Sequence, residues 1–248
     1  MGTRMIAIVS ILAAVYALGS FLPGFPMIGV PGSRIDLTRS LEMGYGLLLG
    51  PIFGPFAAFL GNVVGKVVTG GGSALFFTPL SIVSSLSAAA LGRRRVFGVR
   101  GWALAAIMLG AVIAGWYGTE TGRAAPYYPL LHLTGLGLIL VFRGKIADYV
   151  RSRDKVAVGV ALSSYPSTLA GHMLGNLIFI VLFNPSPVFF VSILPISVVE
   201  RIVLTILSIV IATPLIVVLR IIYPSLFSEL SEKDDPSKAK DVPSSHRS

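Results

Sequence analysis

Residues 36–72 read DLTRSLEMGYGLLLGPIFGPFAAFLGNVVGKVVTGGG and decide the fold of this chain. They predict two membrane helices, about 36–51 and 53–69, joined by a tight turn at Gly50-Pro51 and Gly54-Pro55, because proline and glycine interrupt helices. Glycines spaced four residues apart leave one stripe of each helix without side chains. Helices in lipid associate where small residues let their backbones approach closely. We therefore expect a closely packed helical hairpin.

Four ionisable residues lie within or beside this hairpin: Asp36, Arg39, Glu42 and Lys66. Ionisable side chains are costly in hydrocarbon, so each of them needs a partner or a water-filled pocket. Two interpretations stay open on these residues alone. The four side chains either surround a small-molecule site or form an interfacial salt bridge inside a tightly packed bundle.

The composition is typical of an integral membrane protein. Of 248 residues, 54% are hydrophobic and 12% are charged, and the mean hydropathy is +0.83, whereas a soluble domain averages about 25% charged residues. The chain has no cysteine, which excludes disulfides and thiolate metal sites. Its three histidines lack the HExxH spacing of a zinc site. We expect no metal and no cofactor.

Eight apolar segments are predicted to cross the membrane, at about 5–22, 36–51, 53–69, 74–92, 101–118, 126–142, 156–182 and 197–222. The expected fold class is an all-α integral membrane protein, a polytopic helical bundle that forms a single transmembrane domain over 1–222. The polar segment 223–248 is predicted to be a disordered cytoplasmic tail. The apolar start of the chain also looks like a signal peptide, but a retained helix fits the following spans better.

The basic residues predict the orientation. Two clusters, Arg93–Arg100 and Arg143–Lys155, lie between apolar segments, where the positive-inside rule places cytoplasmic loops. Eight crossings put both termini in the cytoplasm, together with 15 of the 20 Lys and Arg residues. The net charge of +9 then points to anionic lipid head groups as partners rather than nucleic acid. We expect a multi-pass protein of the cell membrane.

Polar residues gather on one face of the segment 156–182: Tyr165, Thr168, His172 and Asn176 follow each other at offsets of three, four and four. Such a face should point into the bundle, to contact a solute or to form interhelical hydrogen bonds. The last segment carries Glu200 and Arg201. Their adjacent side chains diverge, so each is expected to pair with another helix, in a solute site or an ion-pair network.

Two further stretches bear on function. The loop 23–35, PGFPMIGVPGSRI, has too many prolines and glycines for a helix and is too apolar for a solvated loop, so we expect it to fold back over the membrane face as a lid. The stretch from Gly61 to Val67 lacks the spacing and the Ser or Thr of a Walker A motif. Nothing in the sequence requires an enzyme.

Small residues recur on the first segment. Ala13 and Ala17 stand four apart, as do Ser10 and Ala14. Each pair marks a flat face for another helix, in this chain or in a partner.

Four stretches together resemble the substrate-binding S components of energy-coupling-factor (ECF) vitamin transporters. They are Ala13-x-x-x-Ala17, the loop end SRIDL at 33–37, LLLGPIFGPFAAFLGNVVGKVV at 47–68 and PISVVERIVLTILSIVIATPLIVVLR at 195–220. The resemblance covers about 5–92 and 156–222. It implies a six-helix core, with about 101–142 as an inserted helical hairpin. Many members of that family carry an acidic residue where this chain has Lys66.

The resemblance also implies a function. An S component captures a vitamin or similar small solute from outside, in a pocket between the loop after the first helix and the outer ends of the last helices. A membrane coupling protein and two cytoplasmic ATPases then drive uptake. Ala13 and Ala17 would form part of the docking surface for the coupling protein. The candidate solute-binding residues are Arg34, Asp36, Arg39, Asn62, Lys66, Tyr165, His172, Asn176, Glu200 and Arg201.

Two alternatives remain. The chain could be a self-sufficient secondary transporter or channel coupled to an ion through Asp36, Glu42 or Glu200. It could also be a membrane enzyme or assembly factor that uses His172 or Glu200.

Overall fold

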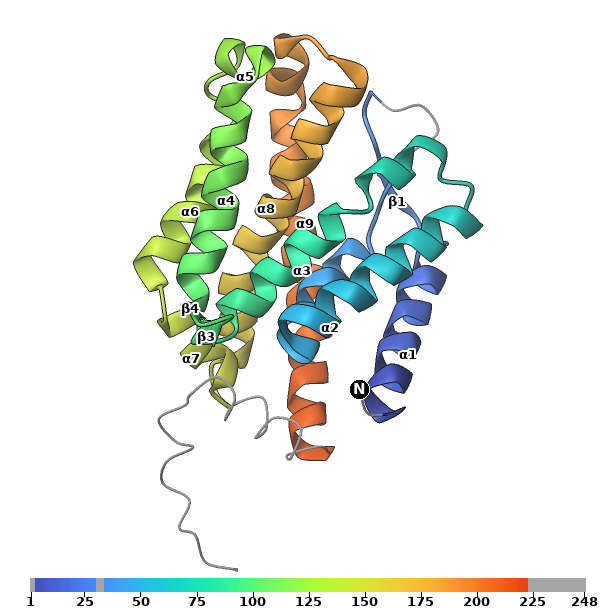
Figure 1. Ribbon diagram of the computed structural model, residues 1–248, viewed down its shortest axis with the longest axis vertical. Coiled ribbons are helices and arrows are strands. Elements are labelled where there is room, and N and C mark those ends of the chain that lie inside the picture. The colour runs from blue at the N-terminus through green and yellow to red at the C-terminus, as the bar shows by residue number, and fades with distance from the viewer. Residues whose placement is uncertain (1–2, 30–33, 223–248) are drawn as a thin grey trace, which may run out of the picture.

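The computed structural model describes residues 3–29 and 34–222, which form a bundle of helices (Figure 1). The helices are α1 (Thr3–Gly19), α2 (Arg39–Val68), η1 (Gly72–Phe77), α3 (Leu80–Leu91), α4 (Gly101–Gly118), α5 (Glu120–Ala124), α6 (Leu130–Phe142), α7 (Lys145–Arg151), α8 (Val156–Phe183) and α9 (Pro187–Ile222). Strand β1 (Gly24–Pro26) pairs antiparallel with β2 (Arg34–Asp36), and β3 (Arg95–Val96) pairs with β4 (Val99–Arg100).

The glycine-rich stretch forms the sharply bent element α2. Its backbone leaves the helical region at Gly50, where φ is 86°, a conformation that glycine adopts without steric cost. A Cβ atom added to Gly54 would lie 2.7 Å from the Cα of Gly46, although eight residues of straight helix rise about 12 Å. The limbs 39–49 and 51–68 therefore fold back on each other, as the V of α2 in Figure 1 shows. The predicted turn is confirmed.

The bare glycine faces of α2 receive neighbouring helices. A Cβ atom on Gly46 would lie 2.0 Å from the carbonyl oxygen of Ser85 in α3, and one on Gly61 would lie 2.7 Å from that of Ala13 in α1. The Arg93 guanidinium donates to the carbonyl of Gly46 at 3.3 Å, which places a cation near the C-terminal end of the first limb. Close backbone contact thus fixes α1 and α3 on the hairpin.

The number of spans differs from the prediction. Five helices in the described residues are long and apolar enough to cross a membrane: α2, η1 with α3, α4, α8 and α9. A sixth span results if α6 and α7, bent by 80° to each other, are counted together. The predicted eight counted α1 and both limbs of α2. With 17 residues α1 rises only about 26 Å, and the first limb of α2 is shorter still.

The segment predicted as an inserted hairpin packs into the bundle. Helices α4 and α6 lie beside α8, and their buried residues Leu109, Ile113 and Ile139 belong to the same hydrophobic core as Leu169 of α8. A second core joins α1 and α2 to the start of α8 and the end of α9. Between these cores, the middle of α8 is held on both sides, which fixes the side chains that it presents to the interior.

The start of α1 and the end of α9 lie at the same end of the bundle as the β3–β4 hairpin and α7 (Figure 1). The β1–β2 ladder and the α8–α9 connection lie toward the other end. The loop after α1 does fold back over the bundle: a Cβ atom on Gly29 would lie 2.7 Å from Cζ of Phe179 in α8 and 3.1 Å from Cζ of Phe189 in α9. The predicted tail at 223–248 lies outside the described residues.

Candidate solute-binding cavity

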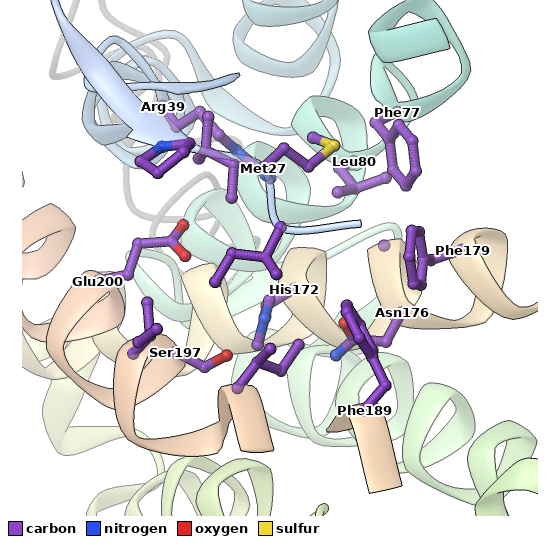
Figure 2. A pocket seen from close by; sticks show the side chains of 16 residues that line it. Met27, Arg39, Phe77, Leu80, His172, Asn176, Phe179, Phe189, Ser197 and Glu200 are labelled. Carbon is purple, nitrogen blue, oxygen red and sulfur yellow. The ribbon is translucent and has the colours of Figure 1, made fainter. Parts of the chain in front are cut away.

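A cavity of ≈ 80 Å³ lies between the loop after α1 and the helices α2, α3, α8 and α9 (Figure 2). Most of its wall is apolar, with Pro26, Met27 and Ile28 from the loop facing Phe179 and Phe189 from the last two helices. The cavity exists because the apolar loop closes over the bundle instead of extending into solvent. This arrangement gives the unusual composition of the loop a structural role.

Polar side chains from three helices also line the cavity: Arg39 from α2, His172 and Asn176 from α8, and Ser197 and Glu200 from α9. Figure 2 shows them around one shared space. Four of these five residues were predicted to bind solute, and the structure brings them together. Ser197 was not predicted, because a single serine in an apolar helix carries little signal.

His172 is backed by a second histidine. Nδ1 of His172 lies 3.1 Å from Nε2 of His132 in α6, and the two rings stack with an interplanar angle of 16°. His132 is fully buried, and its Nδ1 has no hydrogen-bond partner among residues 3–29 and 34–222. Helix α6 therefore supports the cavity wall, although His132 was not predicted as a site residue. No local motif signals a contact between residues 40 positions apart.

Asn176 lines the cavity with an unsatisfied amide. Only 7% of the residue is exposed, and its Nδ2 has no hydrogen-bond partner in the described part of the chain. The Tyr128 hydroxyl lies within hydrogen-bonding reach of Asn176 and Ser197, but no contact of this hydroxyl meets the full distance and angle requirements of a hydrogen bond in that part of the chain. Buried polar groups are usually hydrogen-bonded, so such an exception needs an explanation.

Glu200 and Arg201 form an ion pair at the edge of the cavity. Arg201 is fully buried and donates from Nη1 to the hydroxyl of Thr168 in α8 at 3.0 Å. We predicted that the two adjacent side chains would diverge to other helices. That prediction is wrong for Glu200, which pairs with its neighbour because a fully buried guanidinium requires a nearby anion.

A second polar group, here termed the ion-pair cluster, consists of Arg34, Asp36 and Lys66. Nζ of Lys66 lies 2.8 Å from Oδ2 of Asp36 and donates to the carbonyl of Arg34 at 3.0 Å. Nε of Arg34 lies 3.9 Å from Oδ1 of Asp36. Asp36 is 2% exposed and Lys66 8%. The cluster borders a hollow of ≈ 20 Å³ that Asn62 and Arg39 also line.

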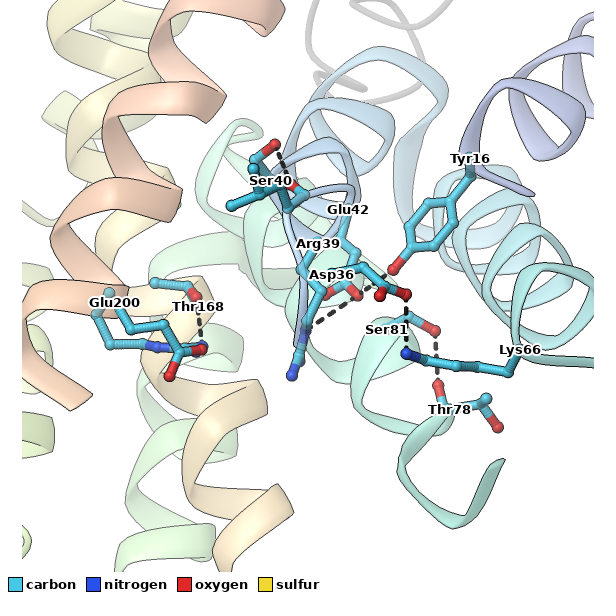
Figure 3. A network of polar contacts seen from close by, with 12 residues as sticks. Tyr16, Asp36, Arg39, Ser40, Glu42, Lys66, Thr78, Ser81, Thr168 and Glu200 are labelled. Carbon is cyan, nitrogen blue, oxygen red and sulfur yellow. Dashed lines mark hydrogen bonds and ion pairs between the residues drawn. The ribbon is translucent and has the colours of Figure 1, made fainter. Parts of the chain in front are cut away.

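Arg39 connects the two regions, since it lines both hollows. Its Nε lies 3.4 Å from Oε1 of Glu42, which accepts a hydrogen bond from the Tyr16 hydroxyl at 2.9 Å. Figure 3 shows this chain of contacts from α1 to the start of α2. Glu42 is thus satisfied by two partners inside the bundle and does not line the cavity.

Tyr165 does not join the site. Its hydroxyl lies 2.7 Å from that of Thr134 in α6, and because Thr134 donates to the carbonyl of Leu131 at 2.6 Å, Tyr165 donates to Thr134. The regular spacing along α8 correctly predicted that these residues share one face of the helix, but it could not predict which part of the protein each of them contacts. Tyr165 lies three turns before Asn176 on that face, where α6 instead of the cavity lies alongside.

Ala13 and Ala17 lie in an interface within the chain. A Cβ atom on Gly61 would lie 3.1 Å from the Cα of Ala13, and one on Gly65 would lie 3.4 Å from that of Ala17. This flat face of α1 therefore receives α2, and the predicted docking surface for a partner is already occupied there. Ser10 and Ala14, the other small pair, are exposed.

A protein of Methanocaldococcus jannaschii, named only as uncharacterised, is 32% identical to this chain over 213 residues, which cover 83% of this chain and 69% of that protein. No protein-family model matches the chain, and no solved structure is significantly similar to it. In the described residues, no three His, Cys, Asp or Glu side chains are grouped so that they could hold a metal ion.

Proposed function

We propose the function of this chain from the geometry of its cavity. The chain belongs to the same family as the Methanocaldococcus jannaschii protein, but the name of that protein assigns no activity. The chain is the substrate-binding subunit of an ECF-type importer in the cell membrane. It captures a small, vitamin-like solute from outside, and partner subunits drive uptake with ATP. The chain itself catalyses no reaction.

The cavity is the observation that supports this proposal. It lies beneath the loop after α1 and between the ends of α8 and α9, which is where the resemblance to S components expects the solute. Its wall combines an apolar surface with a few polar groups, the usual composition of a small-molecule site. Asn176 is buried, and its Nδ2 makes no hydrogen bond of good geometry in the described chain, so a solute can offer this amide a better acceptor than the Tyr128 hydroxyl within its reach.

The charges support the orientation that the proposal needs. Arg94, Arg95 and Arg100 lie at the β3–β4 hairpin, and Lys145 and Arg151 lie in α7. Both elements are at the end of the bundle opposite the β1–β2 ladder (Figure 1). The positive-inside rule makes the basic end cytoplasmic. The cavity then opens toward the outer half of the membrane, where an importer must collect its solute.

The small residues on α1 offer a docking face that differs from the one first expected. Ser10 and Ala14 are exposed, and small residues let a partner helix approach closely. We assign the contact with the membrane coupling protein to this face instead of to Ala13 and Ala17. Ala14→Trp should keep solute binding and abolish assembly with the coupling protein. Val210→Trp, on a surface of α9 that is 62% exposed, is the matched control and should leave assembly intact.

Uptake measurements test the whole proposal. The chain is reconstituted into liposomes alone and with the coupling protein and ATPases of an ECF module from the same organism, and uptake of the solute that co-purifies with it is followed. Uptake that requires the partners and ATP supports an importer subunit. Uptake by the chain alone, driven by a sodium or proton gradient, would show instead a secondary transporter that uses its buried carboxylates Asp36, Glu42 or Glu200.

A further inference from the structure

The apolar wall of the cavity determines the body of the solute. Phe77 and Leu80 contribute to the wall in addition to the loop residues and the two phenylalanines of α8 and α9. Phe179 and Phe189 are stacked, with ring centroids 5.2 Å apart. Such a wall gains free energy by covering an apolar or aromatic group and offers no hydrogen bond to a polar one. The polar groups of the solute must therefore meet the polar side chains of the wall.

Asn176 is one of the polar side chains that carry a donor. Asn176 lines the cavity together with His172 and Ser197 (Figure 2). The residue is 93% buried, since 7% of it is exposed, and Nδ2 makes no hydrogen bond of good geometry in the chain as described, although the Tyr128 hydroxyl lies within reach of the residue. Leaving a buried donor unsatisfied is costly. A solute that brings an acceptor removes this cost when it binds.

The histidine pair presents a second donor. In the contact between Nε2 of His132 and Nδ1 of His172, one nitrogen carries the proton. If His172 donated, Nδ1 of His132 would be a buried N–H without a partner in the described chain, and such groups are rare. His132 therefore donates. Neutral His172 then carries its remaining proton on Nε2, so the nitrogen left for a solute is a donor.

The charged residues do not offset this excess of donors. Glu200 is the one carboxylate among the side chains that line the cavity, and Arg201 pairs with it. Arg39, whose Nε faces Glu42, adds a guanidinium to the same part of the wall. A cationic solute would find one oxygen of its counter-ion, Oε1 of Glu200, already engaged by Arg201. An acceptor meets three donors.

We propose that the cavity binds a small solute with an apolar, preferably aromatic, body and a hydrogen-bond acceptor at its head, either a carboxylate or a carbonyl group. This inference rests on the proposed function, because it concerns the same cavity. It goes further, because it fixes the polarity of the head group. Solutes with a protonated amine at that position should bind more weakly than solutes with an acceptor.

A matched series of ligands on one ring tests this polarity. Benzoate, benzamide, benzylamine and toluene differ only in the group attached to the ring, and their binding is measured by isothermal titration calorimetry with the full chain in lipid nanodiscs. We expect benzoate and benzamide to bind, and benzylamine and toluene to bind at least about tenfold more weakly, as the loss of one well-placed hydrogen bond implies. Benzylamine binding as tightly as benzoate, or no binding by any of the four, overturns the proposal.

A near-isosteric substitution tests the assigned donor. Asn176→Asp replaces the amide nitrogen by a carboxylate oxygen, and the neighbouring Tyr128 hydroxyl can donate to it. Benzoate should bind roughly tenfold more weakly to this variant, while benzylamine gains. Asn184→Asp, the same change at an exposed residue after α8, should bind like the wild type. Unchanged benzoate affinity in Asn176→Asp overturns the assignment, and the order of the four ligands on the wild type decides the question if that variant does not fold.

The outcome is separate from that of the uptake experiment. A reversed order of ligands would leave partner-dependent uptake untouched and would remove only the claim about the head group. Uptake without partners would remove the importer proposal, yet the preference for acceptors would stand, because it depends on the cavity alone.

Discussion

The cavity and the ion-pair cluster both hold polar side chains inside an apolar bundle, but they differ in how those side chains are satisfied. In the cluster, Lys66 lies 2.8 Å from Asp36 and also reaches a backbone carbonyl. At the cavity, Asn176 in the wall and His132 behind His172 keep nitrogen atoms without hydrogen-bond partners in the described chain. In the cluster Asp36 faces two opposite charges, although its Oδ2 makes no hydrogen bond of good geometry in the described chain, whereas the unpartnered nitrogen atoms at the cavity belong to neutral groups.

This difference separates two roles that the sequence could not distinguish. A buried ion pair whose partners are in place contributes to the folded structure, and removing one partner leaves an uncompensated charge. An unsatisfied donor in a hollow lowers stability until a ligand arrives. We therefore assign Asp36 and Lys66 to the fold, and His172 and Asn176 to the solute. Substitutions in the two regions should change stability and affinity in opposite ways.

The largest effect is expected in the cluster. Asp36→Asn leaves Lys66 buried without its counter-ion and should lower the free energy of unfolding by about 3–5 kcal/mol. Reversible unfolding in mixed detergent micelles measures this, and solute affinity of the folded fraction should stay unchanged. Asp148→Asn is the matched control, because the ion pair of Asp148 with Arg94 is exposed and should contribute little. A stable Asp36→Asn variant that no longer binds solute would reverse the assignment.

Asn176→Leu tests the cavity in the opposite direction. The substitution removes the unsatisfied amide, so stability should stay the same or rise by up to about 1 kcal/mol, while benzoate affinity falls roughly tenfold. Titration calorimetry and unfolding of the same preparation give both values. Asn62→Leu, in the hollow beside the cluster, should leave the affinity as it is. Equal losses of affinity in the two variants would mean that both hollows belong to one site.

His132→Phe should have a smaller effect, because His132 positions His172 without lining the cavity itself. The phenyl ring preserves stacking but removes the hydrogen bond that fixes the proton of His172. Benzoate affinity should fall roughly threefold to fivefold, and the preference for benzoate over benzylamine should narrow, since His172 can then donate or accept. Loss of affinity with an unchanged preference would indicate a purely structural role.

Arg34→Ala should have the smallest effect. The side chain of Arg34 is 44% exposed and its nitrogen is 3.9 Å from Asp36, so the pair should contribute about 0.5 kcal/mol or less. Neither unfolding nor benzoate titration should separate this variant from the wild type beyond that amount. A loss comparable to that of Asp36→Asn would show that Arg34, rather than Lys66, holds the carboxylate of Asp36.

The sequence predicted the local geometry of the hairpin because glycine acts locally. Gly50 adopts a backbone conformation that other residues avoid. Gly46 and Gly54 have no side chains, so they allow close backbone contact both within α2 and with another helix. The loop after α1 was predictable for the same reason, since its prolines prevent a helix and its apolar residues disfavour a loop that is exposed to solvent. The span count was less predictable, because a bent helix and two full crossings share one hydropathy pattern.

Which residues belong to the site depends on contacts between segments that are far apart in the sequence. Periodicity placed Tyr165 and Asn176 on one face of α8, but it could not show that α6 lies against the first and the cavity against the second. Likewise, spacing cannot reveal that His132 stacks on His172 from a segment predicted as an insertion. Which small face of α1 receives α2 was equally undetermined, and the structure uses Ala13 and Ala17.

Native mass spectrometry of the protein released from lipid nanodiscs tests most directly the claim that the unsatisfied cavity, and not the ion-pair cluster, holds the solute. We predict a bound small molecule with an acceptor head group in the wild type, its loss in Asn176→Leu, and its retention in the folded fraction of Asp36→Asn. An empty wild type, or a molecule kept by Asn176→Leu and lost from Asp36→Asn, would contradict the claim.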